Sequence, residues 1–284
     1  MVGCCRGFGS ADQGSADVKK PLIINIHTLP KKVLQDMPPK RLSALLLLGL
    51  FFNEAIWLRR LLIQSTFAFR KSADPEPTLN LPALGSLVIF LGTILIGKIH
   101  EGKNKIINLD VKKVYGKESL PKNIENRKIE FLKKHDSAQC KDIRDKLTFH
   151  YNHYKNTGDE EIKKFIENRI NNDLIYQPKF SQDQSIENTF ITLSQFLSTD
   201  KLQEIMGKST IEESLFTFVN NIDNLSVVYC QWCYEIIHHI LSLIPNWAEM
   251  KLEEISIDSP AIDDFELYFF THPPADPKFS EVAT

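Results

Sequence analysis

Two long apolar segments in the first third of the chain constrain its fold more than any other feature. The first, residues 43–58, contains four consecutive leucines, and the second, residues 79–97, contains no charged side chain. A helix that is apolar on most of its sides is typical of the centre of a bundle or of a membrane span. We predict an all-α protein whose antiparallel centre is formed by helices at 38–70 and 81–108.

Polar residues in and beside these segments favour a buried bundle over a membrane span. Asn53 and Glu54 lie inside the first segment, and a carboxylate at the centre of a membrane helix costs about 2.5–3.5 kcal/mol. The second segment contains proline, glycine and polar residues, and Lys98 follows it directly. Membrane association through residues 79–97 is therefore the interpretation that we favour least.

The chain divides into four parts by composition. Glycine and serine dominate its start, which predicts a flexible lead, and residues 22–26 after it are expected to form a short strand or an extended arm. A helical bundle is expected next, then additional C-terminal helices and a tail rich in acidic residues and proline. Further helices are expected near 121–135, 137–155, 159–174 and 210–244. The four predicted parts are residues 1–36, 37–178, 179–250 and 251–284.

Charge and cysteine usage limit the possible partners and cofactors. Lysine and arginine number 34 against 36 acidic residues, for a net charge of −2, so any contact with RNA has to be local. We expect a cytoplasmic protein, because no secretory signal is recognised at the start. Cys230 and Cys233 form a C-x-x-C pair without a second pair to complete a zinc site. The sequence therefore predicts buried helical cysteines, no metal and no cofactor.

One arginine and one histidine late in a predicted helix carry the functional signal. Arg144 and His150 are separated by five residues. An arginine binds phosphate with its planar fork, and histidine is the residue whose ordinary pKa suits proton transfer near neutral pH. An alternative interpretation remains open, because Ile143, Leu147 and His150 also fall on one largely apolar helical stripe. His150 is then a core histidine.

The residues around this pair resemble the R-x(4–6)-H motif of HEPN domains, especially of uncharacterised bacterial members. Arg144-Asp145-Lys146 leads into Phe149-His150-Tyr151, and the segment 96–101 resembles the helix that precedes the motif in that family. The resemblance covers roughly residues 38–175. It implies a four- or five-helix fold, a role in toxin–antitoxin or other defence systems, and a homodimer in which two motifs meet.

Four further residues are candidates for supporting the pair. Asp145 or Glu101 is expected to orient Arg144, and Tyr151 is a neighbour of His150. Glu54 lies between apolar residues of the first long helix, so we expect it to be buried and paired with a basic group. An ordinary ion pair within the bundle is the alternative role for both glutamates.

The residues and the resemblance together predict a metal-independent endoribonuclease, a toxin or defence effector that acts on RNA as a homodimer. RNA supplies its own nucleophile, the 2′-hydroxyl, so cleavage needs a proton-transfer group and a cation rather than a metal. The alternative is a non-catalytic helical module that binds RNA, a nucleotide or a partner protein such as an antitoxin.

Overall fold

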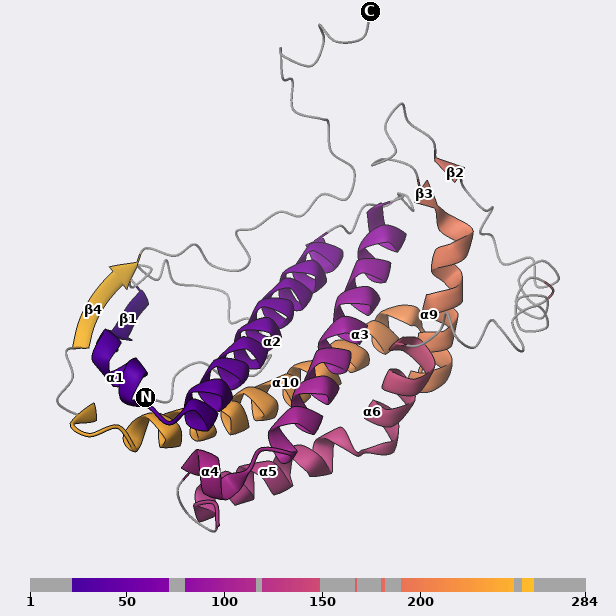
Figure 1. The fold of residues 1–284 in the computed structure, drawn as a ribbon. Helices are drawn as coiled ribbons and strands as arrows, with labels where there is room; N and C mark the ends of the chain where they lie inside the picture. Colours follow the sequence, from indigo (N-terminus) through magenta and orange to yellow (C-terminus); the bar gives the residue numbers. More distant parts are fainter. Residues whose placement is uncertain are drawn as a thin grey trace, which may run out of the picture.

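A computed structural model describes residues 22–71, 80–115, 119–148, 167, 180–181, 190–247 and 252–257. Helices dominate these residues, as the sequence predicted (Figure 1). The longest are α2 (Pro39–Lys71), α3 (Asn80–Ile107) and α10 (Ile211–Ser242). The others are α1 (Lys31–Asp36), α4 (Val111–Tyr115), α5 (Lys122–His135), α6 (Ala138–Asp142), the π-helix η1 (Ile143–Thr148) and α9 (Thr192–Met206).

The core lies where α10 crosses the pair formed by α2 and α3. Helices α2 and α3 run side by side, and α10 packs against both of them and against α5 (Figure 1). One face of α10 is apolar along its whole length, so burying that face in the bundle removes it from water. The largest fully buried side chains include Leu48, Leu95, Phe131, Phe218 and Trp232.

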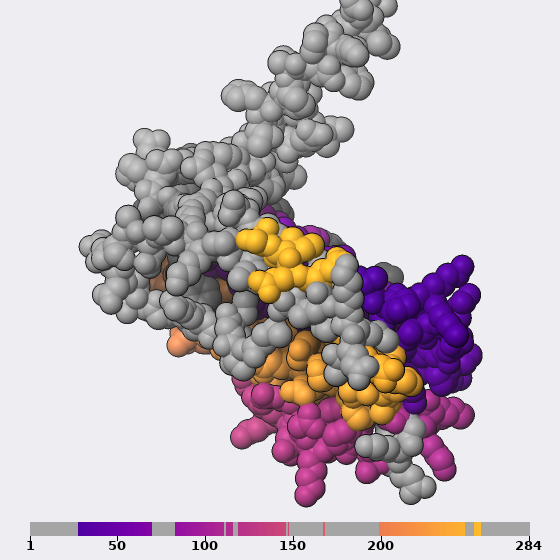
Figure 2. Space-filling view, turned by 90° about the vertical axis from the view of Figure 1, so that its left-hand side faces the viewer, coloured from indigo at the N-terminus to yellow at the C-terminus, as the bar shows by residue number. Residues whose placement is uncertain are grey.

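The surface view shows the same arrangement from another side. In Figure 2, orange α10 lies between the indigo helices of the N-terminal part and the magenta segment that contains α4 and α5. Arg59 of α2 holds α10 with an ion pair to Asp223, in which Nε lies 2.6 Å from Oδ1. Helix α10 therefore lies between the central pair, α2 and α3, and the helices α4 and α5.

Local signals explain where the long helices begin and end. Pro39 is the first residue of α2, a position at which proline is tolerated because its missing N–H has no helical partner. The Thr210 hydroxyl accepts a hydrogen bond from the Glu213 backbone N–H at 3.2 Å and so caps α10. The long helices predicted at 38–70, 81–108 and 210–244 agree with α2, α3 and α10 within two residues at each end.

The structure contains the short strand that was one of two expectations for residues 22–26, and it adds a pairing with the C-terminal part that was not predicted. Strand β1 (Leu22–His27) pairs antiparallel with β4 (Leu252–Ile257), so residues placed in the arm and in the tail form one sheet. A second small sheet joins β2 (Phe180–Ser181) to β3 (Phe190–Ile191). The predicted helix at 137–155 is described only to residue 148, as α6 followed by η1, and almost all of the predicted helix at 159–174 lies outside the described residues.

Two helices of the described chain are long and apolar enough to cross a membrane. These are α2 over Pro39–Phe69 and α3 over Ala83–Ile107. Core helices of soluble proteins pass the same test, and the apolar part of α3 is mostly buried in the bundle. Helix α2 is different, because it exposes Leu46, Leu50 and Trp57 on its outer side.

Candidate functional site

Helix α3 contributes three polar side chains to one face near its C-terminal end. His100, Lys103 and Asn104 follow at three- and four-residue spacing, so they lie next to one another on the helix surface. The Asn104 amide nitrogen lies 3.1 Å from His100 Nε2. Because Asn104 is exposed, the Nε2 side of His100 is the side nearer to solvent.

His135, the last residue of α5, faces His100. The two rings stack with their centroids 5.3 Å apart and an angle of 13° between their planes. His135 is 3% exposed, and its ring also contacts that of Phe131. Its Nδ1 lies 2.6 Å from the carboxylate of Asp136, the residue that caps α5. A histidine at this end of a helix is also near the negative pole of the helix dipole, which favours an imidazolium.

Arg144 reaches His100 from η1. Ser137 caps α6, and the chain then continues from α6 into the wider turns of the π-helix. Such turns are rare in proteins, and those that occur are often found at functional sites. The Arg144 Nη1 atom lies 3.3 Å from His100 Nδ1, and its Nε donates to the Asp145 carboxylate at 2.7 Å.

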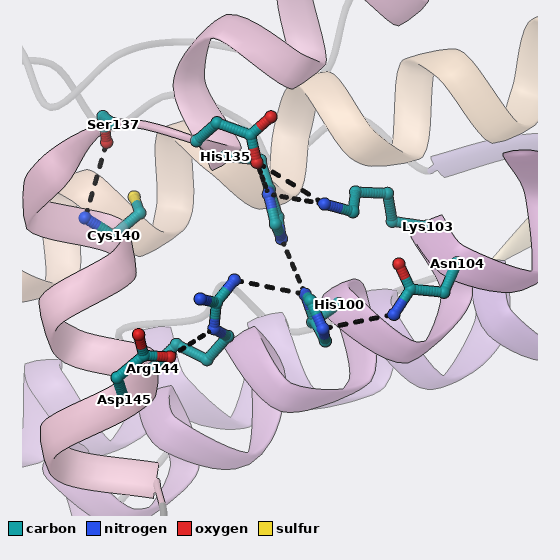
Figure 3. Close-up of polar contacts among 9 residues, drawn as sticks. His100, Lys103, Asn104, His135, Ser137, Cys140, Arg144 and Asp145 are labelled. Carbon is teal, nitrogen blue, oxygen red and sulfur yellow. Dashed lines mark hydrogen bonds and ion pairs between the residues drawn. The ribbon is translucent and has the colours of Figure 1, made fainter.

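These residues converge on His100 and His135 from three helical segments (Figure 3). His135 Nε2 lies 3.3 Å from His100 Nδ1, the same atom that Arg144 approaches. Lys103 Nζ lies 3.3 Å from His135 Nδ1 and 3.4 Å from the Asp136 carboxylate. We call the resulting group the histidine cluster, which consists of His100, Lys103, Asn104, His135, Asp136, Arg144 and Asp145.

Burial and charge hold the two imidazoles neutral. The pKa of His100 is lowered from 6.5, first by desolvation and then by the positive charges of Arg144 and Lys103. The pKa of His135 is also lowered, mainly by burial, although its hydrogen bond to Asp136 acts in the opposite direction. The site therefore combines two neutral imidazoles with two permanent cations, a combination that suits an anionic ligand and proton transfer.

Only some of the residues predicted from the sequence belong to the histidine cluster. Arg144 and Asp145 are part of the cluster, paired with each other. Glu101 instead pairs with Lys98 at 3.7 Å, on the exposed surface of α3. Glu54 is paired with a basic group as predicted, because Lys98 Nζ lies 3.2 Å from its carboxylate, but its side chain is only partly buried at 26% exposure.

His150 and Tyr151 lie outside the described residues, so their expected places beside Arg144 stay predictions. The sequence reasoning missed His135, Lys103 and Asp136, and it did not single out His100 as a proton carrier. The available signals were the helical spacing of His100 to Lys103 and the adjacent pair His135-Asp136.

The cysteines have surroundings that suit a structural role. Cys140 and Cys233 are buried, and Cys230 is half-buried. Burial is the main cause that raises the pKa of both the Cys140 and Cys233 thiols. Within the part of the chain that the structure describes, no group of three or more His, Cys, Asp or Glu side chains could hold a metal ion.

Comparison with known proteins adds no relative to this picture. No protein-family model, no curated protein and no solved structure matches the chain.

Proposed function

We propose that this protein is a metal-independent endoribonuclease of the HEPN type, in which Arg144 binds the scissile phosphate and His100 transfers the proton. The observation that carries the proposal is the 3.3 Å approach of Arg144 Nη1 to His100 Nδ1. A phosphate bound by the guanidinium would thus lie beside a neutral imidazole. The 2′-hydroxyl of RNA is the nucleophile, so the reaction needs no bound cofactor.

The hydrogen bonds of Arg144 leave its planar fork suited to phosphate. Asp145 accepts from Nε and so fixes the plane of the guanidinium, while Nη2, and Nη1 once it turns away from His100 Nδ1, can make two parallel hydrogen bonds to phosphate oxygens. Lys103, whose side chain is 14% exposed, adds a second cation within the same cluster. These charges would stabilise the negative charge that develops on phosphorus during cleavage.

Cleavage of a mixed-sequence RNA in excess EDTA tests this proposal. We expect 2′,3′-cyclic phosphate and 5′-hydroxyl ends, and no cleavage of a substrate that lacks 2′-hydroxyl groups. His100→Ala and Arg144→Ala should each lower the rate by about 10²–10⁴-fold. His238→Ala is the matched control, because His238 is an exposed histidine of α10. His150→Ala should be assayed beside them, since the motif predicts a loss there too.

Binding without cleavage would support the alternative function. In the described structure the cations of the cluster already have carboxylate partners, Asp145 for Arg144 and Asp136 for Lys103. Such closed pairs also suit a module that binds an RNA phosphate or an acidic partner protein, for example an antitoxin, without chemistry. If the wild-type protein binds RNA but leaves it intact after long incubation, the nuclease proposal is wrong and the binding module is the better description.

The proposal includes a homodimer, which the exposed side of α2 supports. Leu46, Leu50, Trp57 and Leu61 are 45–64% exposed and lie at helical spacing. Large exposed apolar patches commonly mark interaction surfaces. Light scattering should give twice the chain mass for the wild type and the single mass for Leu50→Glu. Sedimentation with lipid vesicles, lost in the same variant, would instead indicate that the exposed side of α2 contacts a membrane.

A further inference from the structure

The hydrogen-bond donors around His100 exceed what one neutral imidazole can accept. Arg144 approaches Nδ1 and the Asn104 amide nitrogen approaches Nε2, and both groups are donors. A neutral imidazole has only one nitrogen with a free lone pair. The ring must therefore place its proton on one side: a proton on Nδ1 excludes a hydrogen bond from Arg144, whereas a proton on Nε2 requires the Asn104 amide to turn so that its oxygen accepts.

His135 links this choice to a second proton. Its Nδ1 lies 2.6 Å from the Asp136 carboxylate, so Nδ1 carries a hydrogen and donates. His135 Nε2 then faces His100 Nδ1 at 3.3 Å, and one hydrogen has to lie between these two nitrogens for the contact to be attractive. That hydrogen can belong to either ring. Held by His100, it leaves both rings neutral; held by His135, it makes His135 an imidazolium.

We propose that His100 and His135 form one proton-sharing pair, in which Asp136 stabilises the imidazolium of His135 so that the pair holds a proton between the two steps of RNA cleavage. The RNA part of this inference rests on the proposed function. The sharing of the proton rests on the geometry alone. His135 acts through His100 and is therefore a positioning residue that also stores a proton.

The proton balance of the two steps follows from the contacts. First, the 2′-oxygen bonds to phosphorus as His100 Nε2 takes the 2′-hydroxyl proton, and the hydrogen on His100 Nδ1 moves to His135 Nε2. Next, the bond from phosphorus to the 5′-oxygen breaks and that oxygen takes the proton from His100 Nε2. In the same step His135 returns its Nε2 proton to His100 Nδ1, so that His100 stays neutral throughout. No proton is gained or lost, and one chain supplies both the base and the acid.

Every charged group that faces the pair has a defined effect. Asp136, which caps α5, and Asp145 on η1 favour the protonated form, whereas Lys103 on α3 and Arg144 on η1 oppose it. A phosphate bound to Arg144 would draw its Nη1 away from His100 Nδ1, and that nitrogen is then available for transfer. The resting pair is neutral at pH 7, which is the state the first step needs, because burial lowers the pKa of both histidines.

Nitrogen-15 NMR of the histidine rings tests the pair without RNA. We expect the His100 and His135 signals to titrate together in the wild type. Asp136→Asn should lower the proton affinity of the pair by about tenfold or more, as an opposite charge at this distance changes it by one pKa unit or more. Asp136 is 59% exposed, so this variant should fold. The matched control is Asp110→Asn, because Asp110 is paired with Lys113 in α4 and asparagine can still cap that helix.

The RNA assay then separates the two proposals. If the wild type cleaves RNA, Asp136→Asn should lower kcat about tenfold or more, leave KM unchanged and change the pH profile. Independent titration of His100 and His135, or titration unchanged by Asp136→Asn, would overturn the pair whether or not RNA is cleaved. A coupled titration in a protein that cleaves no RNA would support the pair and refute the nuclease. His135→Asn gives a second test where it remains folded.

Discussion

The close packing of α3 on α10 predicts opposite effects for the same substitution at two glycines. A Cβ atom at Gly92 would lie 2.5 Å from the Phe218 ring and 2.9 Å from Ile222 Cδ1. Both neighbours are fully buried, so neither can move aside easily. At Gly49 on α2, by contrast, an added Cβ meets nothing within 4 Å.

The magnitudes follow from two opposing contributions. Alanine is favoured over glycine in a helix by about 1 kcal/mol, and both sites gain this. Overpacking a core costs about 1–3 kcal/mol, and contact with two buried side chains places Gly92 near the upper end. We expect Gly92→Ala to lower the free energy of unfolding by about 2 kcal/mol. Gly49→Ala should raise it by about 0.5–1 kcal/mol.

Urea unfolding followed by circular dichroism at a helical wavelength measures both effects. The midpoint should fall for Gly92→Ala and rise for Gly49→Ala, with the slope of the transition unchanged. Because both variants share the gain in helix propensity, the difference between them isolates the packing of α3 on α10. Equal stabilisation by the two substitutions would show that these helices do not approach as closely as described, and the position of His100 on α3 would then be in doubt.

Three further predictions concern the core and the cluster. Arg59→Ala should lower the free energy of unfolding by about 1–2 kcal/mol, because it leaves the partly buried Asp223 without its partner. Arg60 is exposed, so Arg60→Ala should change the free energy of unfolding by less than about 0.5 kcal/mol. Both clustered histidines have a folded-state pKa below 6.5, so the unfolded chain takes up protons at a higher pH than the folded one. The free energy of unfolding should therefore fall as the pH drops below 6.5. A free energy of unfolding that rises over this pH range would contradict the lowered pKa values. Buried Cys233 should react with a thiol reagent only after unfolding, and rapid reaction of the native protein would show that α10 is more exposed than described.

Those parts of the fold that depend on neighbouring residues could be predicted from the sequence. The apolar length of α2 and α3, the proline at the start of α2 and the Thr210 cap of α10 are all local signals, and each predicted a helix of nearly the observed extent. The pairing of β1 with β4 joins the two ends of the chain. Nothing in either segment specifies its distant partner, because register is set by the surrounding fold.

The candidate site shows the same division between local and distant information. Arg144 and Asp145 are adjacent in the sequence, and Asp145 was one of the two residues expected to orient Arg144. His135 was hidden because it ends a lysine-rich helix that resembles an ordinary solvated face, and its meaning depends on α3 lying against the end of α5. A histidine acquires a chemical role from the groups around it, which only tertiary packing supplies.

The charge balance of the cluster links proton uptake to anion binding. Asp136 and Asp145 balance Lys103 and Arg144, so the cluster carries no net charge while both imidazoles are neutral. A proton added to His135 gives a net charge of +1 beside the place proposed for phosphate, and an anion bound there would favour that proton. Anion binding and proton uptake are therefore linked, so inorganic phosphate should raise the pKa of the pair. An unchanged histidine titration at saturating phosphate would argue that the anion binds elsewhere.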